Sequence, residues 1–142
     1  MTNKQLLQSA GDGTAIPAGY IGEYVETSLG PTAPGSSQNP FNVGSVSIPA
    51  GRWRVVGYAY LSIGTMAGNN YMLCDLNTTS ATLRSPTRWA QCYVSNGNKG
   101  TTCYTFEINS SSSTTLYLIA QVDFSSVGSG TVSGAIKYTR IG

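Results

Sequence analysis

Histidine is absent from this 142-residue sequence, and charged residues make up only 10% of it. Without histidine no Ser-His-Asp or Cys-His arrangement can form, and the commonest general base is missing. An enzyme would have to rely on the 6 Asp and Glu side chains. Their one close pair, Glu23 and Glu26, has an odd separation that places the two on opposite faces of a strand. We therefore expect no catalytic residues and no metal or other cofactor, and we predict that the chain is not an enzyme.

Basic clusters and long apolar runs are missing too. The 8 Lys and Arg residues are scattered and the net charge is only +2, so nothing forms the basic stripe that nucleic-acid phosphates require. No run of about 18 apolar residues could span a membrane as a helix. Residues 1–11 lack the apolar core of a secretion signal. These absences predict a soluble protein that binds neither nucleic acid nor membrane.

The cysteine count is odd, at 3. At least one of Cys74, Cys92 and Cys103 must therefore remain a thiol or pair between chains. Cys92 and Cys103 flank the turn-rich segment SNGNKG, and one register of a two-residue turn would place them opposite each other, whereas a register shifted by one would not. The sequence leaves this bond undecided. Reduced cysteines that serve as small apolar fillers are the favoured interpretation.

What the sequence does contain is period-two alternation. Residues 45–63 hold two alternating runs that meet at a Pro-Ala-Gly turn. From Trp53 onward every second residue is apolar or glycine, which places one face of a strand in the core. The other face carries Val56, Tyr58 and Tyr60, and it is more apolar than a solvated face requires. We predict that these three residues contact another subunit.

Other segments alternate in the same way. Residues 114–124 and 131–141 are expected to form one hairpin, and residues 89–95 and 101–108, on either side of SNGNKG, another. No segment shows sustained helical spacing. The pattern predicts an all-β domain over residues 16–142, a single antiparallel β-sandwich or jelly roll of about eight strands.

A small cationic and aromatic patch lies in a loop-like segment, where Trp89 follows Arg84 and Arg88. Two interpretations are open. Trp89 could close one end of the sandwich, as a large buried side chain. Alternatively, Arg84, Arg88 and Trp89 contact a ligand, since aromatic rings suit sugar stacking as well as subunit contacts.

Three stretches together resemble a known family: IPAGYIGEYVE, VSIPAGRWRVVGYAYL and TTLYLIAQVDFSSVGSGTVSGAIKYTRIG. The family consists of structural domains from the virions of tailed bacteriophages, found at the ends of tail fibres and as small capsid decoration or head-fibre proteins. The resemblance covers most of the chain from Ile16 onward, but little of residues 63–101. It implies a compact β-sandwich, commonly a homotrimer, displayed on the virion.

The leading segment bears on the choice between these two roles. Residues 1–15 begin with Met1 and are expected to form an N-terminal docking arm, which favours a domain that docks directly on a preformed surface over the tip of a long fibre. We therefore expect a capsid decoration protein on the outer capsid surface, made in the host cytoplasm. Its partners would be copies of itself and the major capsid protein, and its capsid-binding residues would be Lys4, Gln5, Leu6 and Leu7. The alternative is a tail-fibre tip that recognises a host surface polysaccharide.

Overall fold

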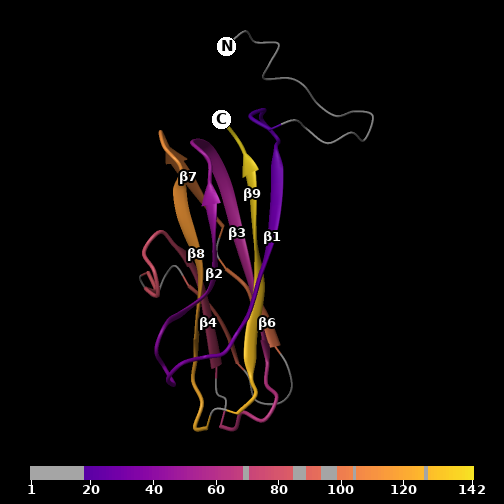
Figure 1. Cartoon of the computed structure of the whole chain (residues 1–142), viewed down its shortest axis with the longest axis vertical. Coiled ribbons are helices and arrows are strands. Elements are labelled where there is room, and N and C mark those ends of the chain that lie inside the picture. Colours follow the sequence, from indigo (N-terminus) through magenta and orange to yellow (C-terminus); the bar gives the residue numbers. More distant parts are fainter. Residues whose placement is uncertain (1–17, 69–70, 85–88, 94–98, 104, 127) are drawn as a thin grey trace, which may run out of the picture.

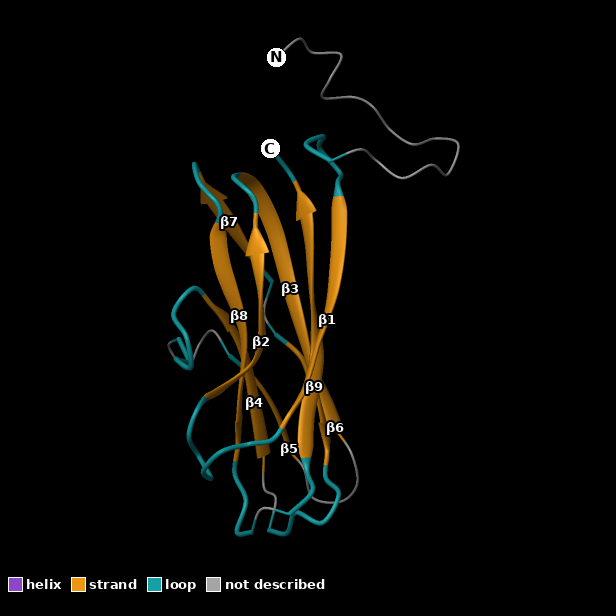
Figure 2. Cartoon of the chain, viewed as in Figure 1, coloured by secondary structure: helices purple, strands orange, loops and turns teal. Residues whose placement is uncertain are grey.

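A computed structural model describes residues 18–68, 71–84, 89–93, 99–103, 105–126 and 128–142. The whole predicted arm, residues 1–15 with Lys4, Gln5, Leu6 and Leu7, lies outside these residues, as does Arg88. The described part of the chain forms nine strands and no helix (Figures 1 and 2). The strands are β1 (Tyr24–Thr32), β2 (Phe41–Ile48), β3 (Gly51–Ser62), β4 (Tyr71–Asn77), β5 (Ala90–Tyr93), β6 (Lys99–Thr102), β7 (Phe106–Ser110), β8 (Thr114–Val122) and β9 (Thr131–Arg140).

The strands form two antiparallel sheets. The first has the order β1-β9-β3, with β6 and β7 both paired to β3, and the second has the order β2-β8-β4-β5. Strand β7 pairs with residues 51–55 of β3 and β6 with residues 58–61, so the two act as one interrupted edge strand. Two sheets of four strand positions each, with the chain passing between them, make a jelly roll. The predicted all-β sandwich is therefore confirmed.

Both predicted hairpins are wrong. Strand β5 pairs with β4 in the second sheet, whereas β6 pairs with β3 in the first. Similarly, β8 pairs with β2 and β4, whereas β9 pairs with β1 and β3. In both cases the chain crosses from one sheet to the other. Alternation fixes which face of a strand is apolar, but it does not say which strand lies beside it.

The core lies between the two sheets, and glycines let the sheets approach closely. A Cβ atom at Gly57 of β3 would lie 3.1 Å from Leu118 Cδ1, and one at Gly134 of β9 would lie 2.5 Å from Leu118 Cδ2. Leu118 of the second sheet therefore occupies a hole between two glycines of the first. In the reverse direction, Leu29 of β1 packs on Gly44 of β2, where a Cβ atom would lie 2.8 Å from the leucine. Such interdigitation gives the sandwich the dense packing of a protein interior.

One end of the sandwich is closed by an aromatic and ionic cluster. Trp53 is fully buried, donates from Nε1 to the Pro49 carbonyl oxygen at 2.9 Å, and packs edge-on against Tyr138 at 5.2 Å between ring centroids. The Arg140 guanidinium lies 4.1 Å above the Trp53 ring and pairs with Glu23 at 3.0 Å. Burial, with the Glu23 charge as a smaller cause, raises the pKa of Tyr138.

The opposite end is formed by loops that hydrogen-bond to one another. Gln38 donates from Nε2 to Asp123 Oδ1 at 2.9 Å, and the main-chain N–H of Ser129 donates to Thr65 Oγ1 at 2.9 Å. The first described residues and the C-terminus both lie at the other end, beside the turns between β2 and β3 and between β7 and β8 (Figure 1). The described part of the molecule thus has one end at which the chain begins and ends, and an opposite loop end.

A disulfide joins Cys74 of β4 to Cys103, which directly follows β6. Both residues are buried, and the bond connects the second sheet to the first. The expectation of reduced cysteines is therefore wrong for this pair, and Cys103 does not bond Cys92. The sequence suggested a partner only across the nearest turn, whereas the actual partner lies 29 residues away, on the other side of the core.

We expect the double substitution Cys74→Ala and Cys103→Ala to lower the free energy of unfolding by about 3–4 kcal/mol, because the disulfide restricts the unfolded chain. Urea denaturation followed by tryptophan fluorescence measures the change. Cys92→Ala is the matched control and should cost clearly less. Equal losses in the two variants would contradict an inter-sheet disulfide.

Candidate functional site

The outward face of the first sheet carries the predicted subunit contact. Val56, Tyr58 and Tyr60 all point away from the core on β3, and the two tyrosines are 40% and 37% exposed. The cross-strand neighbour of Tyr58 on β9 is Ala135. On the other side Tyr58 lies over Gly100 of β6, where any side chain would collide with the tyrosine hydroxyl. The structure therefore brings the three predicted residues together on a face where the tyrosines have small neighbours.

Ion pairs border this face. Arg52 and Arg54 contact Glu107 at 2.8 and 3.5 Å, and Lys137 contacts Glu26 at 3.6 Å. The hydrogen bond from Arg52 is the main reason that the pKa of Glu107 is lowered. Exposed pairs of this kind add little to stability. They do, however, balance charge, so the tyrosine face is flanked by groups of both signs rather than by a field of one sign.

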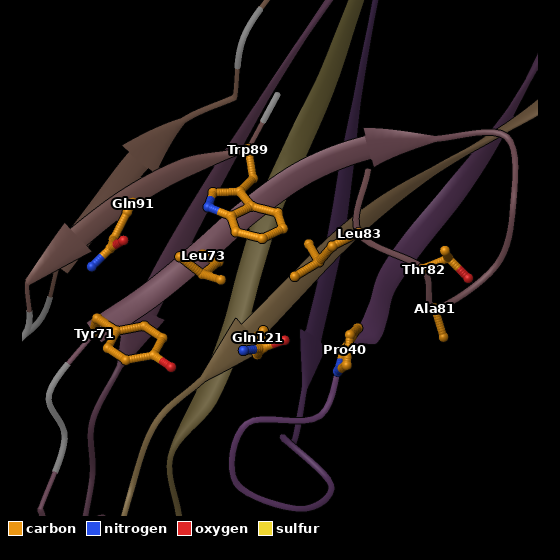
Figure 3. A pocket seen from close by; sticks show the side chains of 9 residues that line it. All are labelled: Pro40, Tyr71, Leu73, Ala81, Thr82, Leu83, Trp89, Gln91 and Gln121. Carbon is orange, nitrogen blue, oxygen red and sulfur yellow. The ribbon is translucent and has the colours of Figure 1, made fainter. Parts of the chain in front are cut away.

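Trp89 lies on the outward face of the second sheet, where it lines a hollow of about 690 Å³ (Figure 3). The connection between β4 and β5 contributes Trp89 and Leu83, and Leu73 of β4 lies beside the Trp89 indole. The interpretation of Trp89 as the side chain that closes one end of the sandwich is therefore wrong; Trp53 has that place. The other lining residues are Pro40, Tyr71, Ala81, Thr82, Gln91 and Gln121.

Arg84 does not line the hollow but anchors the β4–β5 connection to the sheet. Its Nη2 lies 2.6 Å from Asp75 Oδ1, and its guanidinium lies 4.4 Å above the Phe106 ring. Asp75 is fully buried and also accepts hydrogen bonds from the main-chain N–H groups of Leu76 and Arg84, both at 2.8 Å. The predicted patch of Arg84, Arg88 and Trp89 is thus divided: Arg84 fixes the connection, Trp89 faces the hollow, and Arg88 lies outside the described residues.

Two asparagines hold the same connection. Asn77 donates from Nδ2 to the Thr82 carbonyl oxygen at 2.8 Å, and Asn42 accepts a hydrogen bond from the main-chain N–H of Ala81 at 2.7 Å. Together with Asp75 they fix the wall of the hollow that Thr82 and Ala81 form. The sequence contained one signal for the anchoring of this connection: an aspartate within the apolar run 71–76 requires a buried cation nearby. Nothing in the pattern pointed to Asn42.

Within the described residues no three His, Cys, Asp or Glu side chains are grouped so that they could hold a metal ion. The same part of the chain contains no helix long and apolar enough to cross a membrane. Among its carboxylates, Glu23, Glu26, Asp75 and Glu107 are each paired with an arginine or a lysine.

The fold is similar to that of viral proteins, although no protein-family model and no curated protein matches the sequence. A chain from the crystal structure of the T13 particle of infectious bursal disease virus matches 84% of this chain and 32% of its own length, with 13% sequence identity and a TM-score of 0.51. A chain from the structure of the Gx strain of this virus matches 86% of this chain and 32% of its own length, with 12% identity and a TM-score of 0.43. A chain from the crystal structure of its VP2 subviral particle matches 81% of this chain and 30% of its own length, with 14% identity and a TM-score of 0.42. This chain therefore spans about a third of the length of those proteins. The class that fold and strand order define is the all-β jelly-roll sandwich.

We expect Arg84→Met to lower the free energy of unfolding by about 3 kcal/mol, because it leaves the buried Asp75 carboxylate without its cation. Lys137→Met, which removes an exposed partner of Glu26, is the control and should cost no more than about 1 kcal/mol. Urea denaturation of both variants measures the difference. If Arg84→Met costs no more than the control, Asp75 does not depend on Arg84.

Proposed function

We propose that this chain is a virion structural protein of a tailed bacteriophage: a homotrimeric capsid decoration protein that binds the major capsid protein through its N-terminal arm. The observation that carries the proposal is the jelly-roll strand order. Jelly rolls are common in viral capsids, and this fold is similar to that of a chain in the T13 particle of infectious bursal disease virus. Because one fold serves many functions, the resemblance of residues 16–26, 46–61 and 114–142 to phage virion domains is the second support.

The polarity of the sandwich fits docking by one end. The first described residues lie at the same end as the C-terminus (Figure 1), where the main chain of Gly22 and Glu23 hydrogen-bonds to that of Arg140. Residues 1–17 are therefore joined to the sandwich at that end. A capsid bound through this segment would lie next to that end, and the loops around Gln38 and Thr65 would project outward. The proposed role is one of binding alone, and it includes no catalytic step.

The tyrosine face fits a contact between copies. Tyrosine supplies large contact area at little entropic cost and is enriched in protein interfaces. Here Tyr58 and Tyr60 lie on the outward face of the first sheet beside Ala135 and Gly100, and the two tyrosines remain 40% and 37% exposed to a partner. A trimer would present three arms, and three linked weak contacts bind a shell far more tightly than one.

Deleting residues 2–10 should leave a folded trimer that no longer binds capsids, because those residues include the proposed capsid contacts. Cosedimentation with purified undecorated capsids measures binding. The control is Gly35→Ser at the loop end, where an added Cβ atom meets nothing within 4 Å, and this variant should bind as the wild type does. Full occupancy by the truncated protein would overturn the arm proposal.

Electron microscopy of intact particles separates the two virion roles, since the tail-fibre alternative places the protein at the tail.

Substituting both Tyr58→Glu and Tyr60→Glu should convert the trimer to a monomer, because glutamates would place like charges in the proposed subunit contact. Sedimentation velocity measures the mass, and circular dichroism checks that the β-structure is kept. Tyr93→Glu, at a tyrosine that is 76% exposed on the second sheet, is the matched control and should remain trimeric. A wild-type monomer at micromolar concentration, or a double variant that is still trimeric, would refute this contact.

A further inference from the structure

We propose that the hollow on the outward face of the second sheet binds a neutral saccharide. Nine of the residues that the structure describes line the hollow, and none of these nine is charged (Figure 3). They combine aromatic surface, from Trp89 and Tyr71, with the side-chain amides of Gln91 and Gln121. A sugar ring presents an apolar C–H face and an edge of hydroxyl groups, and this lining offers a surface for each.

The two amides are placed by the register of the sheet. Leu73 of β4 pairs with Gln91 of β5 on one side and with Gln121 of β8 on the other. The three side chains therefore form one row on the outward face. Neighbouring strands lie about 4.8 Å apart, so the two amides originate from strands roughly 10 Å apart, with the apolar Leu73 between them. Leu73 itself is only 5% exposed, so a sugar ring would rest on the aromatic and amide side chains around Leu73 rather than on the leucine itself.

Trp89 lies beside this row. Figure 3 shows its indole next to Leu73, with Leu83 close by and Tyr71 farther along β4. A sugar ring bound in the hollow would therefore have the indole near one of its faces. Aromatic groups and a few placed polar groups are the usual composition of a small-molecule site, and about 690 Å³ lies within the usual size range.

The wall that carries Thr82 and Leu83 is held in place before any ligand arrives. The Asp75–Arg84 pair is buried beneath it, and Asn77 and Asn42 bind its main chain at 2.8 and 2.7 Å. A wall fixed in this way avoids part of the cost of ordering the protein on binding. The site is therefore largely preformed on this side.

The lining chemistry favours a saccharide over other ligands. An anionic ligand would find no cation among the described lining residues. A purely apolar ligand would bury the amides of Gln91 and Gln121 without partners, which is costly. Amides both donate and accept hydrogen bonds, as sugar hydroxyls do. The hollow lies on the opposite sheet from the tyrosine face, so binding here does not depend on the proposed trimer or on capsid attachment.

The test uses the full chain and saturation-transfer NMR with glucose, galactose, mannose, N-acetylglucosamine and their short oligomers, beside sialylated and sulfated sugars. We expect at least one neutral sugar to bind, and Trp89→Ala and Gln121→Ala each to weaken its affinity at least tenfold. Tyr93→Ala is the control: this exposed tyrosine lies on the same sheet but outside the lining, and the variant should bind as the wild type does.

Two further variants keep the test decisive. Trp89→Phe retains an aromatic face and should recover part of the affinity lost in Trp89→Ala, and thermal denaturation shows whether each variant is folded. If Trp89→Ala does not fold, Gln91→Ala with Gln121→Ala replaces it. The proposal is overturned if no neutral sugar binds at millimolar concentration, if the folded variants bind as well as the wild type, or if only anionic sugars bind. Capsid cosedimentation is a separate measurement, so failure here leaves the decoration role untouched.

Discussion

The insertion of leucine side chains between glycines of the facing sheet is the contact on which the sandwich depends. Leu118 is seated between Gly57 and Gly134, and Leu29 is seated on Gly44. A side chain at any of these glycines would have to displace the leucine, and at Gly134 it would also collide with the Tyr58 carbonyl oxygen. Glycine normally weakens a strand, but here the cost is offset by close sheet packing. The disulfide and the Trp53 cluster then secure a sandwich that is already closely packed.

The sequence predicted the parts of the fold that depend on one strand at a time. The alternation from Trp53 to Leu61 and from Leu116 to Val122 assigned inward and outward faces correctly, and these inward side chains are buried. Strand neighbours could not be predicted in this way. Because the chain changes sheets after β5 and again after β8, strands that follow each other closely in the sequence lie in different sheets. Both expected hairpins failed for this reason.

The candidate site was predictable to a similar degree. Tyr58 and Tyr60 could be placed on an outward face because their position depends only on the alternation of β3. Trp89 was recognised as a candidate, but the row of Gln91, Leu73 and Gln121 belongs to three strands that the topology brings together. Its members are ordinary residues when each is read within its own segment. The Cys74–Cys103 pair was missed for the same reason, since it joins segments on opposite sides of the core.

The two sheets differ in what covers them, and this difference separates the proposed roles. The first sheet exposes side chains of its own strands, with Tyr58 and Tyr60 beside small residues and a smaller hollow of about 190 Å³ next to Val56 and Tyr58. The second sheet is partly covered by the β4–β5 connection, and an anchored loop above a sheet creates a hollow rather than a plane. The hollow on the second sheet is the larger of the two, at about 690 Å³. The exposed tyrosines of the first sheet therefore fit the proposed contact between copies, and the larger hollow of the second sheet fits the proposed small ligand.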